Sequence, residues 1–265
     1  MRILFLGDIV GEPGRKAVIN RVPSLKREKE IDFIIANGEN SASGRGITPK
    51  ISIDLLRCGI AVLTSGDHIW DQKEIVEYLP TEPRLLRPIN YPDGTPGNGS
   101  VVLETAKGKV AVINGQGRTF MNPPLDNPFS RLEDEARRLR ADEGVKVIFV
   151  DFHAETTSES IAMGYHLDGK VSAVVGTHTH VQTADERILE NGTAHLTDAG
   201  MCGPERSVLG RNVESVVWRF KTGMPTRFPV AKGQVRLCGV MVDIDEGTGK
   251  ALAIERYNEL LDLGA

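Results

Sequence analysis

Short apolar runs, each closed by a polar, glycine-bearing turn, recur along the chain. The first run, Arg2–Leu6, leads into the glycine-rich loop Gly7–Gly14, and a charged, helix-like stretch follows to about Lys29. Apolar runs of this length that alternate with helical patterns are typical of buried parallel strands joined by helices. The same pattern predicts strands at Asp32–Ala36, Ile60–Thr64, Val145–Val150, Val171–Val175, Ala194–Thr197, Val235–Asp243 and Leu252–Tyr257.

Helical and turn patterns fill the segments between these strands. Helices are predicted at about Pro49–Cys58, Gln72–Leu79, Ser130–Asp142 and Ser158–His166. A hairpin is predicted from Val101–Glu104 and Val110–Asn114, and loops from Leu86–Gly99, Gly115–Pro128 and Asp198–Arg211. This order predicts an α/β fold in one domain that spans residues 1–265, with residues 82–128 as a candidate insertion.

Composition and charge narrow the class of protein. The chain has 265 residues and a formal net charge of −4, so its surface as a whole does not attract nucleic acid or anionic membranes. No apolar run approaches the roughly 18 residues of a membrane span, and Asp8 interrupts the apolar start too early for a signal peptide. Cys58, Cys202 and Cys238 cannot pair evenly, which favours a reducing, cytoplasmic location.

Side chains that can bind metals follow the predicted strands. Four of the six histidines do so, namely His68, His153, His178 and His180, and so do the carboxylates Asp8, Glu39 and Asp67. The carboxyl ends of parallel strands meet at one edge of a sheet, so we expect these side chains to converge. Three histidines and three carboxylates exceed what one tetrahedral zinc needs. Two metal ions bridged by a carboxylate and a water are the usual device for hydrolysing phosphate esters.

The pair His178 and His180 is the clearest metal-binding signal. In an extended segment, side chains two residues apart point the same way, so one ring could serve each metal. His166, in a helical stretch, and His195, in a strand, are expected to have structural roles instead. The loop arginines Arg45, Arg118, Arg206 and Arg211 are of a kind that could clamp a phosphate, but each one taken singly is expected to be solvated surface.

These motifs carry a resemblance to a known family. Gly7-Asp8, Gly38-Glu39-Asn40, Gly66-Asp67-His68, His153 and Gly176–His180 resemble the pattern of calcineurin-like metallophosphoesterases. The segments 37–47, 87–99, 150–160, 174–185 and 195–204 more closely resemble the YmdB family of bacterial phosphodiesterases, and the match spans nearly the whole chain. The resemblance implies a metallophosphoesterase-like sandwich of two central β-sheets flanked by helices.

The resemblance also implies a function and its residues. It implies hydrolysis of cyclic nucleotides, 2′,3′-cyclic nucleotides in particular, by a hydroxide that bridges two divalent or mixed-valence ions, iron or manganese before zinc or magnesium. His68 would protonate the leaving group or donate a hydrogen bond to the phosphoryl oxygen. One metal would take Asp8, Glu39, Asn40 and His180, and the other would take Glu39, Asp67, His153 and His178, with Glu39 as the bridge.

Two positions depart from the general pattern. Val10 stands where the wider superfamily has a histidine, and Asn40 fills this vacancy, as in the YmdB family. Asp67 stands where the usual motif has asparagine. With Asp8, Glu39 and Asp67 ionised, the ligands carry −3 against +4 from two divalent ions, which favours tighter metal binding and a less acidic bridging water. We expect Asp67 to keep its place as a ligand and to change the metal preference.

Two other functions fit the same residues. A phosphomonoesterase would use the same metals, and a regulatory protein would bind a cyclic nucleotide without turnover. The expected partner is a small-molecule phosphodiester, without bulk nucleic acid or membrane, and a homo-oligomer stays open. His68 separates the enzyme from the sensor, because a pure binder has no need of an acid that faces a leaving group.

Overall fold

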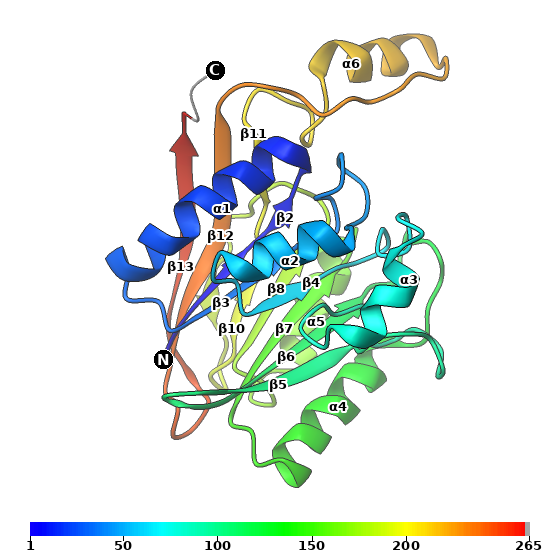
Figure 1. Ribbon diagram of the computed structural model, residues 1–265. Helices are drawn as coiled ribbons and strands as arrows, with labels where there is room; N and C mark the ends of the chain where they lie inside the picture. The colour runs from blue at the N-terminus through cyan, green and yellow to red at the C-terminus, as the bar shows by residue number, and fades with distance from the viewer. Residues whose placement is uncertain (263–265) are drawn as a thin grey trace.

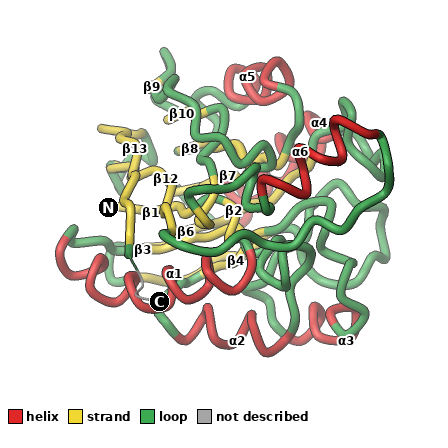
Figure 2. Tube along the Cα trace, turned by 90° about the horizontal axis from the view of Figure 1, so that it is seen from above, coloured by secondary structure: helices red, strands yellow, loops and turns green. Residues whose placement is uncertain are grey.

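The computed structural model describes residues 1–262, in which two β-sheets pack face to face and helices cover their outer faces (Figure 1, Figure 2). The predicted sandwich of two sheets flanked by helices is therefore confirmed. The central strands are apolar because both of their faces are covered. All five residues of the strand Phe33–Asn37 are buried, for example.

The first sheet is mixed. At its centre β1 (Arg2–Leu6) runs parallel to β3 (Phe33–Asn37) and antiparallel to β12 (Val235–Ile244). The strand order is β2-β11-β12-β1-β3-β4, and β13 pairs with the other edge of β12. The remaining strands are β2 (Asp8–Ile9), β4 (Val62–Thr64), β11 (Met201–Pro204) and β13 (Ala251–Leu261).

The second sheet has the order β5-β6-β7-β8-β10-β9. Its central strands β6, β7, β8 and β10 are parallel, and β5 and β9 are antiparallel strands at its two edges. Parallel strands place their carboxyl ends together, which is where the candidate ligands lie. The strands are β5 (Ser100–Thr105), β6 (Gly108–Gln116), β7 (Val147–His153), β8 (Ala173–Thr177), β9 (Arg187–Ile188) and β10 (Ala194–Leu196).

Three apolar layers hold the sheets and helices together. Between the sheets, the rings of Phe5 and Phe149 pack with their centroids 5.3 Å apart. A second layer lies under α1 (Gly11–Glu28) and α2 (Pro49–Arg57), and a third lies under α4 (Pro128–Asp142) and α5 (Thr157–His166). Burying one large aliphatic or aromatic side chain contributes about 1.5–3 kcal/mol, so these layers supply most of the stabilisation.

Several predicted element boundaries near the site were wrong. The glycine-rich loop is shorter than predicted, because β2 forms at Asp8 and α1 already begins at Gly11. The predicted loop after Asp198 contains β11, which pairs with β12 and β2. The predicted helix near Gln72–Leu79 is only α3 (Ile75–Tyr78), followed by the short 3-10 helix η1 (Leu79–Thr81). The predicted hairpin of β5 and β6 is confirmed.

One helix was not predicted. α6 (Val213–Thr222) stands at the top of Figure 1, away from the helices that cover the sheets. Of its side chains only Val216 is buried, while Phe220 is 83% exposed. No helix among residues 1–262 is both long and apolar enough to cross a membrane.

Candidate metal centre

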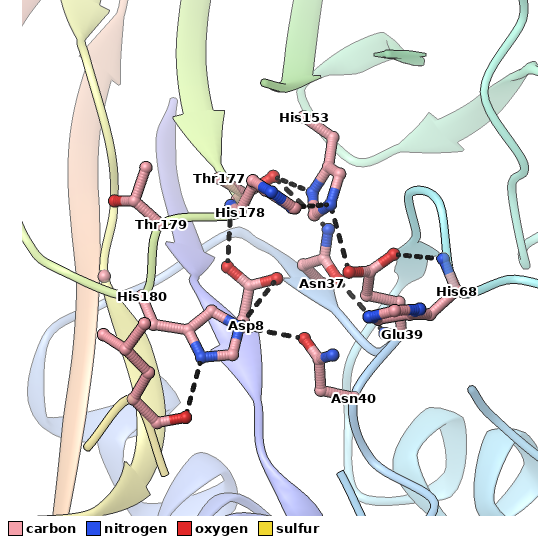
Figure 3. A network of polar contacts seen from close by, with 12 residues as sticks. Asp8, Asn37, Glu39, Asn40, His68, His153, Thr177, His178, Thr179 and His180 are labelled. Atoms are coloured by element: carbon pink, nitrogen blue, oxygen red, sulfur yellow. Dashed lines mark hydrogen bonds and ion pairs between the residues drawn. The ribbon is translucent and has the colours of Figure 1, made fainter. Parts of the chain in front are cut away.

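Both sheets deliver candidate ligands to one place, as Figure 3 shows. The first sheet supplies residues at the ends of β1, β3 and β4, and the second sheet supplies residues at the ends of β7 and β8. The sequence predicted this convergence, and the structure brings the residues together. They are Asp8 in β2, Glu39 and Asn40 after β3, Asp67 and His68 after β4, His153 at the end of β7, and His178 and His180 after β8.

Four of these residues form what we call the four-residue cluster: Glu39, Asp67, His153 and His178. One ligand atom from each lies within 4.8 Å of all the others. The Nε2 atom of His153 is the hub, at 3.0 Å from Glu39 Oε1, 3.2 Å from Asp67 Oδ1 and 3.0 Å from His178 Nδ1. Glu39 is 1% exposed and His153 is fully buried, so water does not screen these contacts.

The histidines and carboxylates of the four-residue cluster shift one another's pKa. Burial opposes protonation of His153, but the facing carboxylates of Glu39 and Asp67 win and raise the pKa of His153 well above its ordinary value. Burial likewise opposes ionisation of Asp67, but the neighbouring rings of His153 and His178 hold its pKa below the ordinary range. The cluster therefore favours a positive charge at its centre.

The other three candidate ligands form what we call the three-residue group: Asp8, Asn40 and His180. His180 Nε2 lies 3.1 Å from Asn40 Oδ1 and 4.0 Å from Asp8 Oδ1. Burial raises the pKa of Asp8 well above its usual value and lowers the pKa of His180 to about 4. The backbone N–H of His178 donates to Asp8 Oδ2, but the buried Asp8 Oδ1 has no hydrogen-bond partner among residues 1–262.

The histidine pair is not extended as predicted. His178 has φ 107° and His180 has φ 64°, both in the region that residues other than glycine rarely adopt. Each such residue costs about 1–3 kcal/mol unless its surroundings hold it in place. Asp198 does so, because its carboxylate accepts hydrogen bonds from the Thr179 N–H and hydroxyl, both at 2.9 Å, and from Gly200 N–H at 2.7 Å.

This turn sends the two rings to different places. His178 reaches the four-residue cluster, while His180 reaches the three-residue group (Figure 3). One ring for each group was the predicted outcome, but left-handed backbone produces it rather than the alternation of an extended strand.

The ring nitrogens show whether these residues suit a metal. His178 Nε2 faces Glu155 Oε2 at 3.0 Å, and His180 Nδ1 faces the carbonyl of Leu209 at 3.2 Å. A carboxylate and a carbonyl only accept, so these nitrogens carry the ring protons. The other nitrogen of each ring therefore turns a lone pair toward the oxygens of the site. A nitrogen lone pair and a carboxylate oxygen that face each other repel, unless a cation lies between them.

The spacing of the ligand atoms also suits a metal. Two atoms about 2.1 Å from one ion and at right angles lie about 3.0 Å apart. In the four-residue cluster the separations around His153 Nε2 are 3.0–3.2 Å. The unpartnered Asp8 Oδ1 in the three-residue group is the kind of buried oxygen that a metal satisfies. The donor set, of imidazole nitrogens with carboxylate and amide oxygens, suits iron, manganese or zinc.

Sequence reasoning missed a group of buried residues behind the cluster. The Thr177 hydroxyl lies 2.8 Å from His153 Nδ1 and donates to Asp151 Oδ1 at 2.7 Å. Asn37 and Thr64 donate to the other oxygen of the same carboxylate. Burial raises the pKa of Asp151 to about 6. Asp151 stands two residues before His153, and side chains two apart on a strand share a face, so this spacing could have revealed it.

His68 lies at the margin of the cluster. Its backbone N–H donates to Glu39 Oε2 at 3.2 Å, and its ring Nδ1 lies 3.2 Å from Asp71 Oδ2. With Nδ1 facing Asp71, Nε2 is left to contact a substrate. The side chain is 24% exposed, so a bound molecule could reach it.

The remaining histidines and two loop arginines serve other contacts. His166 pairs with Glu133 at 3.1 Å, and burial lowers the pKa of His195 in β10. Arg45 pairs with Asp71 at 2.9 Å, and Arg211 donates to the backbone carbonyls of Ser43, Gly44 and Phe228. Arg211 therefore braces the loops beside the site, and it is not a free surface cation as the sequence suggested.

Comparison with known proteins fits this geometry. A family model described as YmdB-like protein matches residues 4–257. The chain belongs to the YmdB-like family. A Bacillus subtilis (strain 168) protein named 2′,3′-cyclic-nucleotide 2′-phosphodiesterase is 51% identical to this YmdB-like chain over 256 residues, which cover 97% of this chain and 96% of that protein.

Solved structures agree with the family. A hypothetical protein from Thermus thermophilus is 40% identical, with a TM-score of 0.90 over 98% of this chain and 99% of that one. A structure from Mycoplasma pneumoniae, described as a novel phosphatase, is 36% identical, with a TM-score of 0.92 over 99% of this chain and 94% of that one. The resemblance seen in the sequence is confirmed, and so is the metallophosphoesterase-type fold that it implied.

Proposed function

We propose that this YmdB-like protein hydrolyses phosphodiesters, 2′,3′-cyclic nucleotides above all, at a centre of two divalent or mixed-valence metal ions. The observation that carries the proposal is the pair of adjoining ligand groups, in which one nitrogen of each of three imidazole rings faces carboxylate or amide oxygens. The name of the Bacillus subtilis relative supports the substrate class.

The two groups would each hold one ion. Asp8, Asn40 and His180 would hold the first, and Asp67, His153 and His178 would hold the second. Glu39, which the resemblance assigns as the bridge, lies against the second group through Oε1. Iron and manganese are the ions that the family resemblance implies, and imidazole together with carboxylate suits such ions. Bound there, the ions would activate a water as the nucleophile and neutralise charge on the phosphoryl oxygens.

His68 is proposed to act on the leaving group. Its ring Nδ1 lies 3.2 Å from Asp71 Oδ2, and its backbone N–H donates to the Glu39 carboxylate, so the residue is held beside the cluster. Its Nε2 could then give a proton to the departing alkoxide or donate a hydrogen bond to a phosphoryl oxygen.

The charge of the centre favours a diester over a monoester. Asp8, Glu39 and Asp67 carry −3 against +4 from two divalent ions, which leaves +1. A diester brings one negative charge, whereas a monoester brings about two at neutral pH. Arg45 and Arg211, which lie in or contact the loop that follows Asn40, are already occupied by Asp71 and by backbone carbonyls.

A pair of chromogenic substrates tests this preference. The purified protein, with Mn²⁺ or Fe²⁺ added, should hydrolyse bis(p-nitrophenyl) phosphate faster than p-nitrophenyl phosphate, and it should turn over 2′,3′-cyclic AMP. Equal or faster hydrolysis of the monoester would favour the phosphomonoesterase.

The sensor alternative has its own test. If the parent protein shows no turnover and a His68→Ala variant binds 2′,3′-cyclic AMP as the parent does, the protein is a cyclic-nucleotide binder rather than an enzyme. We expect instead that His68→Ala lowers kcat by about 100-fold or more and leaves metal content unchanged.

A further inference from the structure

The orientation of His153 depends on a partner that can either donate or accept. The protons of His178 and His180 are fixed by acceptor-only partners, a carboxylate and a carbonyl. His153 Nδ1 instead meets the hydroxyl of Thr177 at 2.8 Å. A hydroxyl can donate or accept, so Thr177 alone does not decide which ring nitrogen of His153 carries the proton.

A chain of buried hydrogen bonds decides whether Thr177 donates to His153 Nδ1 or accepts from it. It starts at the backbone N–H of Glu39, which can only donate and lies 3.1 Å from Asn37 Oδ1. The amide of Asn37 is therefore oriented with Nδ2 away from Glu39, and Nδ2 donates to Asp151 Oδ2 at 3.1 Å. Asn37 thus presents a fixed donor to Asp151.

The donor at Asn37 in turn fixes the direction of the hydrogen bond between Asp151 and Thr177. The fully buried carboxylate of Asp151 also accepts from the hydroxyl of Thr64, so donors surround it. The one proton of the Thr177 hydroxyl is used in the 2.7 Å hydrogen bond to Asp151 Oδ1. The Thr177 oxygen can then only accept from His153 Nδ1, so a neutral His153 ring carries its proton on Nδ1 and presents the Nε2 lone pair to the four-residue cluster.

We propose that Asp151, acting through Thr177, is a positioning residue that fixes the His153 tautomer and thereby makes Nε2 a metal ligand. This inference rests on the proposed metal centre, and it concerns how the protein builds that centre. The network joins β3 and β4 of one sheet to β7 and β8 of the other, so the same carboxylate also ties the two sheets together behind the site.

Asp151→Asn should reverse the direction of these hydrogen bonds, because asparagine has nearly the same shape as aspartate but carries an NH₂ group. Asn37 presents a fixed donor, so the new amide must turn its oxygen toward Asn37 and its NH₂ toward Thr177. The Thr177 hydroxyl then accepts from that NH₂ and donates to His153 Nδ1, and the ring proton moves to Nε2. Partners behind a metal ligand are typically worth about 10–100-fold in affinity, so we expect a loss of that size for Mn²⁺.

Three matched variants separate tautomer control from general support of the fold. Thr177→Val removes the hydroxyl next to His153 and should weaken Mn²⁺ binding about as much as Asp151→Asn. Thr177→Ser keeps the hydroxyl and should bind within about 3-fold of the parent. Thr64→Val removes a buried hydroxyl from the same carboxylate but does not contact His153, so it should also stay within about 3-fold.

Titration calorimetry of the metal-free proteins with Mn²⁺ provides the affinities, and NMR of the zinc-loaded parent reports the tautomer. Long-range ¹H–¹⁵N correlations should place the His153 proton on Nδ1. A proton on Nε2 in the parent, an unchanged affinity in Thr177→Val, or an equal loss in Thr64→Val would each overturn the inference. His153→Ala tests the metal centre separately: if it binds Mn²⁺ as the parent does, His153 is not a ligand and the proposed function loses its main support.

Discussion

The four-residue cluster and the three-residue group adjoin each other, yet they compensate buried charge in opposite ways. In the cluster, His153 and two carboxylates stabilise one another, and the pKa of His153 is raised well above its usual value. In the group, burial lowers the pKa of His180 to about 4 and raises that of Asp8, and Asp8 Oδ1 has no partner among residues 1–262.

The difference shows how each part behaves without metal. A proton on His153 can take the place of a cation in the cluster, so the cluster keeps its attractive contacts. The three-residue group has no such substitute, because His180 stays neutral and Asp8 is desolvated. Metal removal should therefore destabilise the three-residue group more than the four-residue cluster.

The largest effect is expected from Asp8→Asn compared with Glu39→Gln. Replacing a ligand should lower kcat/KM on bis(p-nitrophenyl) phosphate by more than about 100-fold in both variants. Asp8→Asn should lose only the metal of the three-residue group, whereas Glu39→Gln should lose part of both, as measured by metal analysis. Asp8→Asn should also leave the metal-free protein at least as stable as the parent, because a desolvated carboxyl is gone. Retention of both metals and of the rate in Asp8→Asn would contradict the assignment of this group.

The next effect is a pH dependence of the metal-free protein. The pKa of His180 falls from 6.5 unfolded to about 4 folded, so the unfolded chain binds more protons and stability is lost as the pH falls from about 6.5 toward 4. That shift corresponds to about 3 kcal/mol at most. The raised pKa of His153 acts oppositely, since its contribution is present at low pH and is lost as the pH rises through the folded value.

Urea unfolding in EDTA at pH 7.5 and pH 5 measures this contrast. Relative to pH 7.5, the free energy of unfolding at pH 5 should be higher in His180→Gln than in the parent, because the variant lacks the group whose folded pKa is lowered. Identical pH dependences would show that His180 is not held neutral by burial.

A smaller effect is expected from Asp67→Asn. The amide oxygen can occupy the same position in the cluster, so both metals should remain and the rate should change by less than about 10-fold, with a different order of preference among Mn²⁺, Fe²⁺ and Zn²⁺. Metal content and rate with each ion are the measurements. Loss of the second metal would show that the carboxylate is needed for binding itself.

The smallest effect is expected from Glu155→Gln. Glu155 Oε2 lies 3.0 Å from His178 Nε2, but the Glu155 side chain is 49% exposed. Exposed ion pairs contribute little, and the amide oxygen of glutamine can still accept, so Mn²⁺ affinity should fall by no more than about 2–5-fold. A loss as large as that of Asp151→Asn would mean that exposed and buried partners of the histidines matter equally.

The positions of the candidate ligands after apolar runs predicted where these side chains meet, but not how the backbone presents them. Asp8, Glu39 and His153 could be placed because each follows or ends an apolar run, and parallel strands bring such ends together. The turn at His178 and His180 could not be read from the sequence, because Asp198, about twenty residues away, holds it. Asp151 was within reach, since it shares a strand face with His153. α6 was not, because only Val216 of its side chains is buried.

The position of β12 determines when this site can exist during synthesis. β1, which leads into Asp8 at the start of β2, pairs on one side with β12, where Arg2 faces Asp243 and Leu6 faces Gly239. The carbonyl of Cys238 accepts from the N–H of Gly7 directly before Asp8. The first ligand-bearing strand to leave the ribosome therefore waits for residues 235–244 before its sheet closes around it. At 5–20 residues per second this delay lasts roughly 10–50 s. A nascent chain that does not yet include residues 235–244 therefore lacks the strand that closes the first sheet beside the metal centre.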